Sequence, residues 1–84
     1  MNYTVLLKRS AEKELERLDL KTHDKIIKQL LALKQNPLTK GVKKLQGREG
    51  YRMRIGDYRI LYEIDETEKE IEVFSVAHRK EVYR

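Results

Sequence analysis

Hydrophobic and polar residues follow two different periods along the chain, and these periods predict its elements. Residues 2–8 alternate with a period of two, which places Tyr3, Val5 and Leu7 on one side and predicts a first strand. Residues 10–18 and 20–35 instead repeat their apolar side chains at helical spacing. The first third of the chain therefore reads as a strand followed by two helices.

Helix boundaries are indicated by capping residues. Ser10 is the expected N-cap of the first helix, and Asp19 is the expected N-cap of the second. Asn36 should end the second helix, because the residue before a proline is pushed out of the helical region. Two helices joined this tightly are expected to pack as an antiparallel pair.

Two further alternating runs flank Gly56-Asp57, a two-residue link of the kind that closes a tight β-hairpin. With this link as the turn, the facing pairs are Ile55 with Tyr58, Arg54 with Arg59, Met53 with Ile60, and Arg52 with Leu61. Residues 58–64 form the third strand, an acidic turn follows, and residues 71–77 form the fourth. Short turns between successive strands predict an antiparallel meander.

Together these elements predict an α+β fold in the order β-α-α-β-β-β. An N-terminal strand and an antiparallel helical hairpin precede a three-stranded antiparallel meander, and the helices pack on one face of the twisted sheet. Eighty-four residues leave room for one domain, spanning 1–84.

Three arginines of the predicted hairpin gather on one face of the sheet. Side chains alternate along a strand, so Arg52, Arg54 and Arg59 share a face, and six apolar or aromatic residues share the other: Tyr51, Met53, Ile55, Tyr58, Ile60 and Tyr62. Like charges placed across a hairpin are destabilising, so such a cluster indicates an anion site. The alternative is a solvated face whose arginines pair with Glu49, Glu63 or Glu72.

Net charge narrows the class of partner. Nineteen Lys and Arg against fourteen Asp and Glu give +5, which favours a polyanion such as nucleic acid. The polar connection at residues 37–49 adds candidate RNA contacts: Lys40, Lys43, Lys44 and Arg48.

Several functional classes lack their motifs. The chain has no cysteine and no Gly-rich phosphate loop, and its two histidines, His23 and His78, form no metal-binding motif. Ser75 has no triad context. No apolar run approaches membrane-spanning length. We therefore expect a cytoplasmic protein without metal, cofactor or membrane partner.

The C-terminal tail carries the remaining candidate chemistry. His78 and Arg79 should lie at the end of the fourth strand, and the tail could bring Tyr83 back towards the arginines. RNA cleavage needs a base for the 2′-hydroxyl, cations for the phosphorane and an acid for the 5′-oxygen. Arginine supplies the cations well and the base badly. His78 and Tyr83 could equally be a surface residue and an apolar anchor.

At these residues the sequence resembles the RelE branch of the RelE/ParE toxin superfamily, over nearly the whole chain. The resemblance is carried by residues 44–47 (KLQG), 50–62 (GYRMRIGDYRILY) and 76–83 (VAHRKEVY). It implies the toxin of a type II toxin–antitoxin pair that acts as a metal-independent endoribonuclease on messenger RNA in the ribosomal A site. Its implied partners are a cognate antitoxin, the ribosome and messenger RNA.

The family's site residues correspond to Arg52, Arg54, Arg59, Arg79 and Tyr83. The best-studied pattern has lysines where this chain has Arg52 and Arg54, and a crowded lysine loses its proton far more easily than an arginine. The general base is therefore open, with His78 as a candidate because its ordinary pKa is near 6.5.

Two other functions are compatible with the sequence. Gyrase-poisoning members look similar over the central hairpin, so a ParE-type non-catalytic DNA gyrase inhibitor is the main alternative. A non-toxic RNA-binding relative is the other. The Arg79 and Tyr83 pair in the tail favours the messenger-cleaving branch.

Overall fold

A computed structural model of the chain describes residues 2–78. Seven elements follow one another along it: β1 (Thr4–Leu7), α1 (Arg9–Glu16), α2 (Leu20–Leu33), β2 (Lys43–Lys44), β3 (Tyr51–Ile55), β4 (Tyr58–Asp65) and β5 (Glu70–His78). All four strands and both helices predicted from the periodicity are present. The two-residue strand β2 is an addition that the sequence pattern did not indicate.

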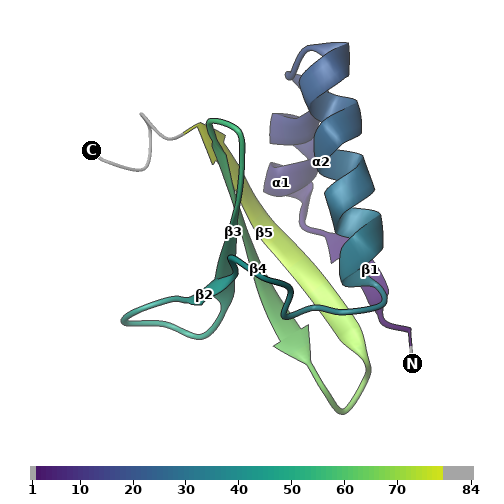
Figure 1. The fold of residues 1–84 in the computed structure, drawn as a ribbon, viewed down its shortest axis with the longest axis vertical. Coiled ribbons are helices and arrows are strands. Elements are labelled where there is room, and N and C mark those ends of the chain that lie inside the picture. The colour runs from purple at the N-terminus through teal and green to yellow at the C-terminus, as the bar shows by residue number, and fades with distance from the viewer. Residues whose placement is uncertain (1, 79–84) are drawn as a thin grey trace.

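The sheet has five strands in the order β1-β5-β4-β3-β2, and α1 and α2 lie side by side on one of its faces (Figure 1). Strands β2 to β5 pair antiparallel, whereas β1 pairs with β5 in parallel. The α+β fold with helices on one face is therefore confirmed. The sheet is mixed because β5, the last strand of the meander, lies beside β1 and runs in the same direction.

The cap of α1 differs from the prediction. The helix begins at Arg9, and Lys8, not Ser10, occupies the N-cap position without a side-chain cap. The backbone N–H of Lys8 donates to the carbonyl of Val73 at 2.9 Å, and the Lys8 carbonyl accepts from the N–H of Glu12. Strand pairing thus holds Lys8 where the helix must start, and Ser10 falls inside the first turn.

The second helix follows the predicted cap. Asp19 accepts a hydrogen bond from the backbone N–H of Thr22 at 3.2 Å, as an N-cap should. The helix ends at Leu33, two residues before the predicted end. None of the helices within residues 2–78 is long and apolar enough to span a bilayer.

Tyr62 ties the core to the loop that follows α2. Its ring is fully buried among the apolar side chains of both layers, and its hydroxyl donates to the carbonyl of Pro37 at 2.6 Å. Burial, assisted by the nearby Tyr51, raises the pKa of Tyr62 to about 12. Tyr51 approaches it with ring centroids 6.0 Å apart.

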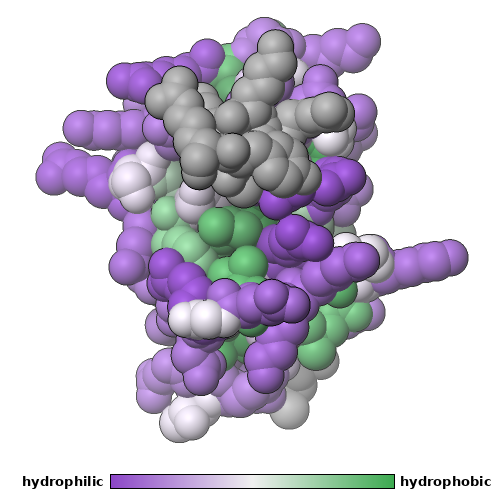
Figure 2. Space-filling model, turned by 90° about the vertical axis from the view of Figure 1, so that its left-hand side faces the viewer, coloured by the Kyte–Doolittle hydropathy of each residue, from purple (hydrophilic) through white to green (hydrophobic). Residues whose placement is uncertain are grey.

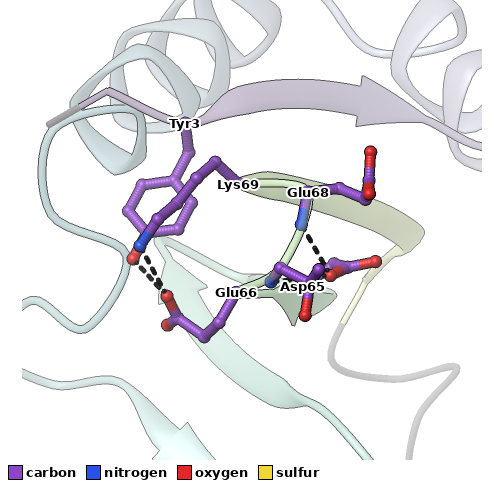
Figure 3. A network of polar contacts seen from close by, with 6 residues as sticks. Tyr3, Asp65, Glu66, Glu68 and Lys69 are labelled. Carbon is purple, nitrogen blue, oxygen red and sulfur yellow. Dashed lines mark hydrogen bonds and ion pairs between the residues drawn. The ribbon is translucent and has the colours of Figure 1, made fainter.

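A polar cluster anchors β1 to the turn between β4 and β5 (Figure 3). The hydroxyl of Tyr3 and the ammonium of Lys69 both donate to Glu66 Oε1, at 2.9 and 3.1 Å. The backbone N–H of Thr4 donates to the Lys69 carbonyl at 2.9 Å. Asp65 accepts two backbone N–H groups within the same turn. The turn is thereby ordered, and it aligns β1 beside β5.

We predict that Tyr62→Phe lowers the free energy of unfolding by about 1–2 kcal/mol, because the Pro37 carbonyl loses its buried donor. Urea unfolding followed by circular dichroism measures this change. Tyr51→Phe is the matched control, because the ring of Tyr51 lies beside that of Tyr62. The Tyr51 hydroxyl makes no hydrogen bond to the described residues. Equal losses in both variants would contradict the role given to the Tyr62 hydroxyl.

The same tyrosine predicts a pH dependence. Its pKa of about 12 in the folded state lies above the value of 10.0 expected when the chain is unfolded. The folded state therefore binds the proton of the Tyr62 hydroxyl more tightly than the unfolded chain does. The contribution of this group to the free energy of unfolding is fully present below pH ~10 and is lost as the pH rises from ~10 to ~12. Unfolding titrations across this range should show a steeper loss in the wild type than in Tyr62→Phe; parallel curves would contradict it.

Candidate nucleic-acid interface

The β3–β4 hairpin has the register predicted from its turn. Ile55 pairs with Tyr58, Arg54 with Arg59, Met53 with Ile60, and Arg52 with Leu61. Gly56 opens the two-residue turn with φ 58°, a left-handed value that glycine adopts without strain. The turn therefore determines which side chains face away from the helices.

The three arginines meet at one cavity of about 220 Å³ on the face of the sheet away from the helices. Lys43 of β2 joins them because it pairs directly with Arg52. Arg54 is exposed and Arg52 is half-buried, whereas Arg59 is only 7% exposed. We call the set formed by Lys43, Arg52, Arg54 and Arg59 the basic cradle.

Two guanidinium groups of the cradle are not neutralised by carboxylates of the described residues. Within residues 2–78, no carboxylate lies at ion-pair distance from Arg52 or Arg54. Glu63, one of the predicted alternatives, pairs instead with Arg48 at 3.2 Å. Planar guanidinium groups donate two parallel hydrogen bonds to phosphate oxygens, so an anion bound here would relieve their mutual repulsion.

His78 does not join the cradle. It pairs with Tyr58 across β4 and β5, and its ring meets the Tyr58 ring edge-on with centroids 5.2 Å apart. Because side chains alternate, His78 and Tyr58 face the helix side, while Arg59 and its partner Ala77 face the other. Arg79 and Tyr83 lie outside the described residues.

The residues predicted to contact RNA lie in different environments. Lys40 is exposed in the loop before β2, and Lys44 is exposed on β2, where it pairs with Tyr51. Arg48 lies over the ring of Phe74, with its guanidinium carbon 4.1 Å from the ring centroid.

Sequence reasoning missed a second cavity beside β2. It measures about 490 Å³ and is lined by Lys43, Lys44, Leu45, Gln46 and Arg52. Figure 2 shows the side of the molecule on which β2 and β3 lie, where hydrophilic side chains surround a smaller apolar area. Gln46 carries no charge, so the charge pattern does not indicate it, although it belongs to the KLQG motif at residues 44–47.

A closed loop supports this cavity. The backbone N–H of Leu45 donates to the Gly50 carbonyl at 2.9 Å, joining the two ends of the loop. Gly50 has φ 129°, and a Cβ atom there would lie 2.9 Å from the Tyr62 carbonyl oxygen. Only glycine allows this approach without displacing the backbone.

The opposite end of the outer face is acidic. A cavity of about 150 Å³ there is lined by Leu6, Ile64, Glu63, Asp65, Glu70 and Glu72. Within residues 2–78, no set of three or more histidine and carboxylate side chains is arranged to hold a metal ion. The sheet thus presents opposite charges at its two ends, which would orient a polyanion towards β2 and β3.

Residues 5–83 match the family model described as the ParE toxin of the type II toxin–antitoxin system parDE. No curated protein matches the chain.

Solved structures give the same fold. The RelBE2 toxin–antitoxin complex from Mycobacterium tuberculosis is 27% identical, with a TM-score of 0.84, and the match covers 94% of this chain and 100% of the other. The archaeal RelE–RelB complex from Pyrococcus horikoshii OT3 is 27% identical with a TM-score of 0.84, covering 94% and 97%. The isolated E. coli RelE toxin is 26% identical with a TM-score of 0.80, covering 96% and 90%.

Because the family model spans nearly the whole chain, the chain belongs to the ParE toxin family of the RelE/ParE superfamily of type II toxin–antitoxin toxins, and its solved structural neighbours include RelE toxins.

Proposed function

We propose that this toxin is a ribosome-dependent endoribonuclease that cleaves messenger RNA in the ribosomal A site without a metal ion. The observation that carries the proposal is the convergence of Arg52, Arg54, Arg59 and Lys43 on one cavity. Four cations at a single cavity of about 220 Å³ fit a phosphate group and its developing charge.

The reaction that such a cradle supports is internal transesterification. The 2′-oxygen of a ribose attacks the adjacent phosphorus, and the bond from phosphorus to the 5′-oxygen breaks. The 2′-hydroxyl proton is lost and the leaving 5′-oxygen gains one, so the products are a 2′,3′-cyclic phosphate and a 5′-hydroxyl. Arg52, Arg54 and Arg59 bind the non-bridging oxygens and stabilise the phosphorane more than the substrate.

Proton transfer requires groups beyond the cradle. Arginine keeps its proton at any physiological pH, and His78 lies across the sheet from the cradle. We assign Arg79 to the leaving 5′-oxygen and Tyr83 to orienting a base and sharing in proton transfer. His78 retains a role in contacting RNA, as do Lys40, Lys44 and Arg48. The ribosome would hold the 2′-oxygen in line with the bond that breaks.

The proposed partners follow from the same surface. The structures of the Mycobacterium and Pyrococcus neighbours are toxin–antitoxin complexes. We expect a cognate antitoxin to cover the basic cradle with acidic and apolar segments, since complementary charge favours and orients that contact. Ribosomal RNA and messenger RNA are the other partners, and they place the action of the toxin in the cytoplasm.

A second candidate is a ParE-type inhibitor of DNA gyrase without catalysis of its own. The observation that favours it is the family model, which is described as a ParE toxin. In this case the cradle would bind the partner or DNA as a cationic surface, and no bond would be broken.

We predict that Arg54→Ala lowers the rate of A-site cleavage by roughly a hundredfold or more, because a preorganised donor to the phosphorane is removed. Arg54 is exposed, so the fold should survive the change. Primer extension on a defined message in a translation extract measures the rate. Arg17→Ala, an exposed arginine beside α1, is the control and should cut normally. Undiminished cutting by Arg54→Ala would contradict the assignment.

The tail distinguishes the two candidate functions. A double variant, Arg79→Ala with Tyr83→Ala, should abolish cutting of the message while the circular dichroism spectrum stays unchanged. The wild type should cut far faster with ribosomes than without them. Absence of cuts in both conditions, together with gyrase-dependent DNA breaks in a parallel reaction, would establish the gyrase inhibitor instead.

A further inference from the structure

The cavity beside β2 adjoins the basic cradle. The two cavities share Lys43 and Arg52, which pair directly across β2 and β3. The second cavity, at about 490 Å³, is more than twice the volume of the first, at about 220 Å³. A phosphate in the cradle would therefore have a larger space next to it, on the β2 side of the hairpin.

The walls of this larger space differ from those of the cradle. Lys43, Lys44 and Arg52 line it with positive charge, but Leu45 and Gln46 bring an apolar side chain and a neutral amide. A site for phosphate alone would need neither. An apolar wall suits the face of a nucleobase, and a side-chain amide offers both a donor and an acceptor to a base edge.

The amide is held on an ordered frame. Gln46 closely follows the two-residue strand β2, and the loop that contains it is closed by the hydrogen bond from Leu45 to Gly50. The close approach of Gly50 to the buried Tyr62 fixes the end of that loop against the core. A reading residue on such a frame loses less conformational entropy on binding than one on a free loop.

We propose that the cavity beside β2 binds the nucleotide next to the scissile phosphate, and that Gln46 reads the edge of its base. The proposal rests on the nuclease function given above and adds a specificity-determining residue to it. Adenine fits best, because its N6 amino group and N7 pair with the acceptor and the donor of a glutamine amide. Lys43 and Lys44 would contact the flanking phosphates.

The test maps cuts in a translation extract programmed with messages randomised at the A-site codon. Wild type should favour adenine at one position beside the cut by roughly five- to a hundredfold, the range of one good amide–base pair. Gln46→Ala should flatten this preference by slowing the cuts beside adenine, while cutting beside the other three bases changes only a few-fold. Gln46→Glu, which removes the donor, should shift the preference towards cytosine, whose amino group donates to a carboxylate.

Two control variants distinguish recognition of the base by Gln46 from attraction of the phosphates by lysine. Gln29→Ala, an exposed glutamine on α2, should leave the preference intact. Lys43→Ala should weaken RNA binding for all four bases and reduce its salt dependence by about one phosphate contact, whereas Gln46→Ala should leave the salt dependence unchanged. A base preference that persists in both Gln46 variants, or a wild type without any preference, would overturn the proposal.

A binding measurement keeps this inference separate from the nuclease proposal. Short RNAs with a 2′-deoxy sugar at the cut site cannot react, so their affinities report recognition alone. If the wild type cuts no message but binds the adenine-bearing RNA more tightly through Gln46, the nuclease function fails and the reading site stands. If it cuts messages while Gln46→Ala binds all four RNAs with wild-type affinities, only the reading site fails.

Discussion

The core and the basic cradle both depend on the two-residue turn at Gly56-Asp57. It fixes the register of β3 against β4, and a shift of one residue would exchange the two faces of a strand. In the observed register Met53 and Ile60 enter the core, while Arg54 and Arg59 stand opposite each other on the outer face. Core packing and the basic cradle are therefore two consequences of a single register.

This register carries an electrostatic cost that the core outweighs. Like charges directly opposite each other destabilise a strand pair by roughly 0.2–1 kcal/mol. Burial of one large apolar side chain contributes about 1.5–3 kcal/mol, and Met53, Ile55 and Ile60 are all buried on the other face. The fold can thus keep Arg54 beside Arg59, and a bound phosphate would convert the repulsion into attraction.

The outer face is basic at one end and acidic at the other because of the order of the strands. Strand β2 lies at one edge and adds Lys43 to the cradle, whereas the turn between β4 and β5 gathers acidic residues towards the other end. Glu66 and Lys69 of that turn bind Tyr3 and hold β1 parallel to β5. The acidic cavity and the basic cradle therefore lie towards opposite ends of the sheet.

Local pattern in the sequence was sufficient for both helices, four strands, the hairpin register and the shared face of Arg52, Arg54 and Arg59, because each follows from spacing along a short segment. The parallel pairing of β1, the strand β2, the burial of Arg59 and the cavity beside Gln46 depend on residues far apart in the chain. His78 is the clearest case in which the local sequence pattern did not predict the surroundings of a side chain. Its position next to Arg79 suggested a place in the site, but the pleat of β5 turned its ring towards Tyr58 on the helix side. Spacing along the chain thus specified which cations share a face, whereas their surroundings came from the pairing of distant strands, which no short segment encodes.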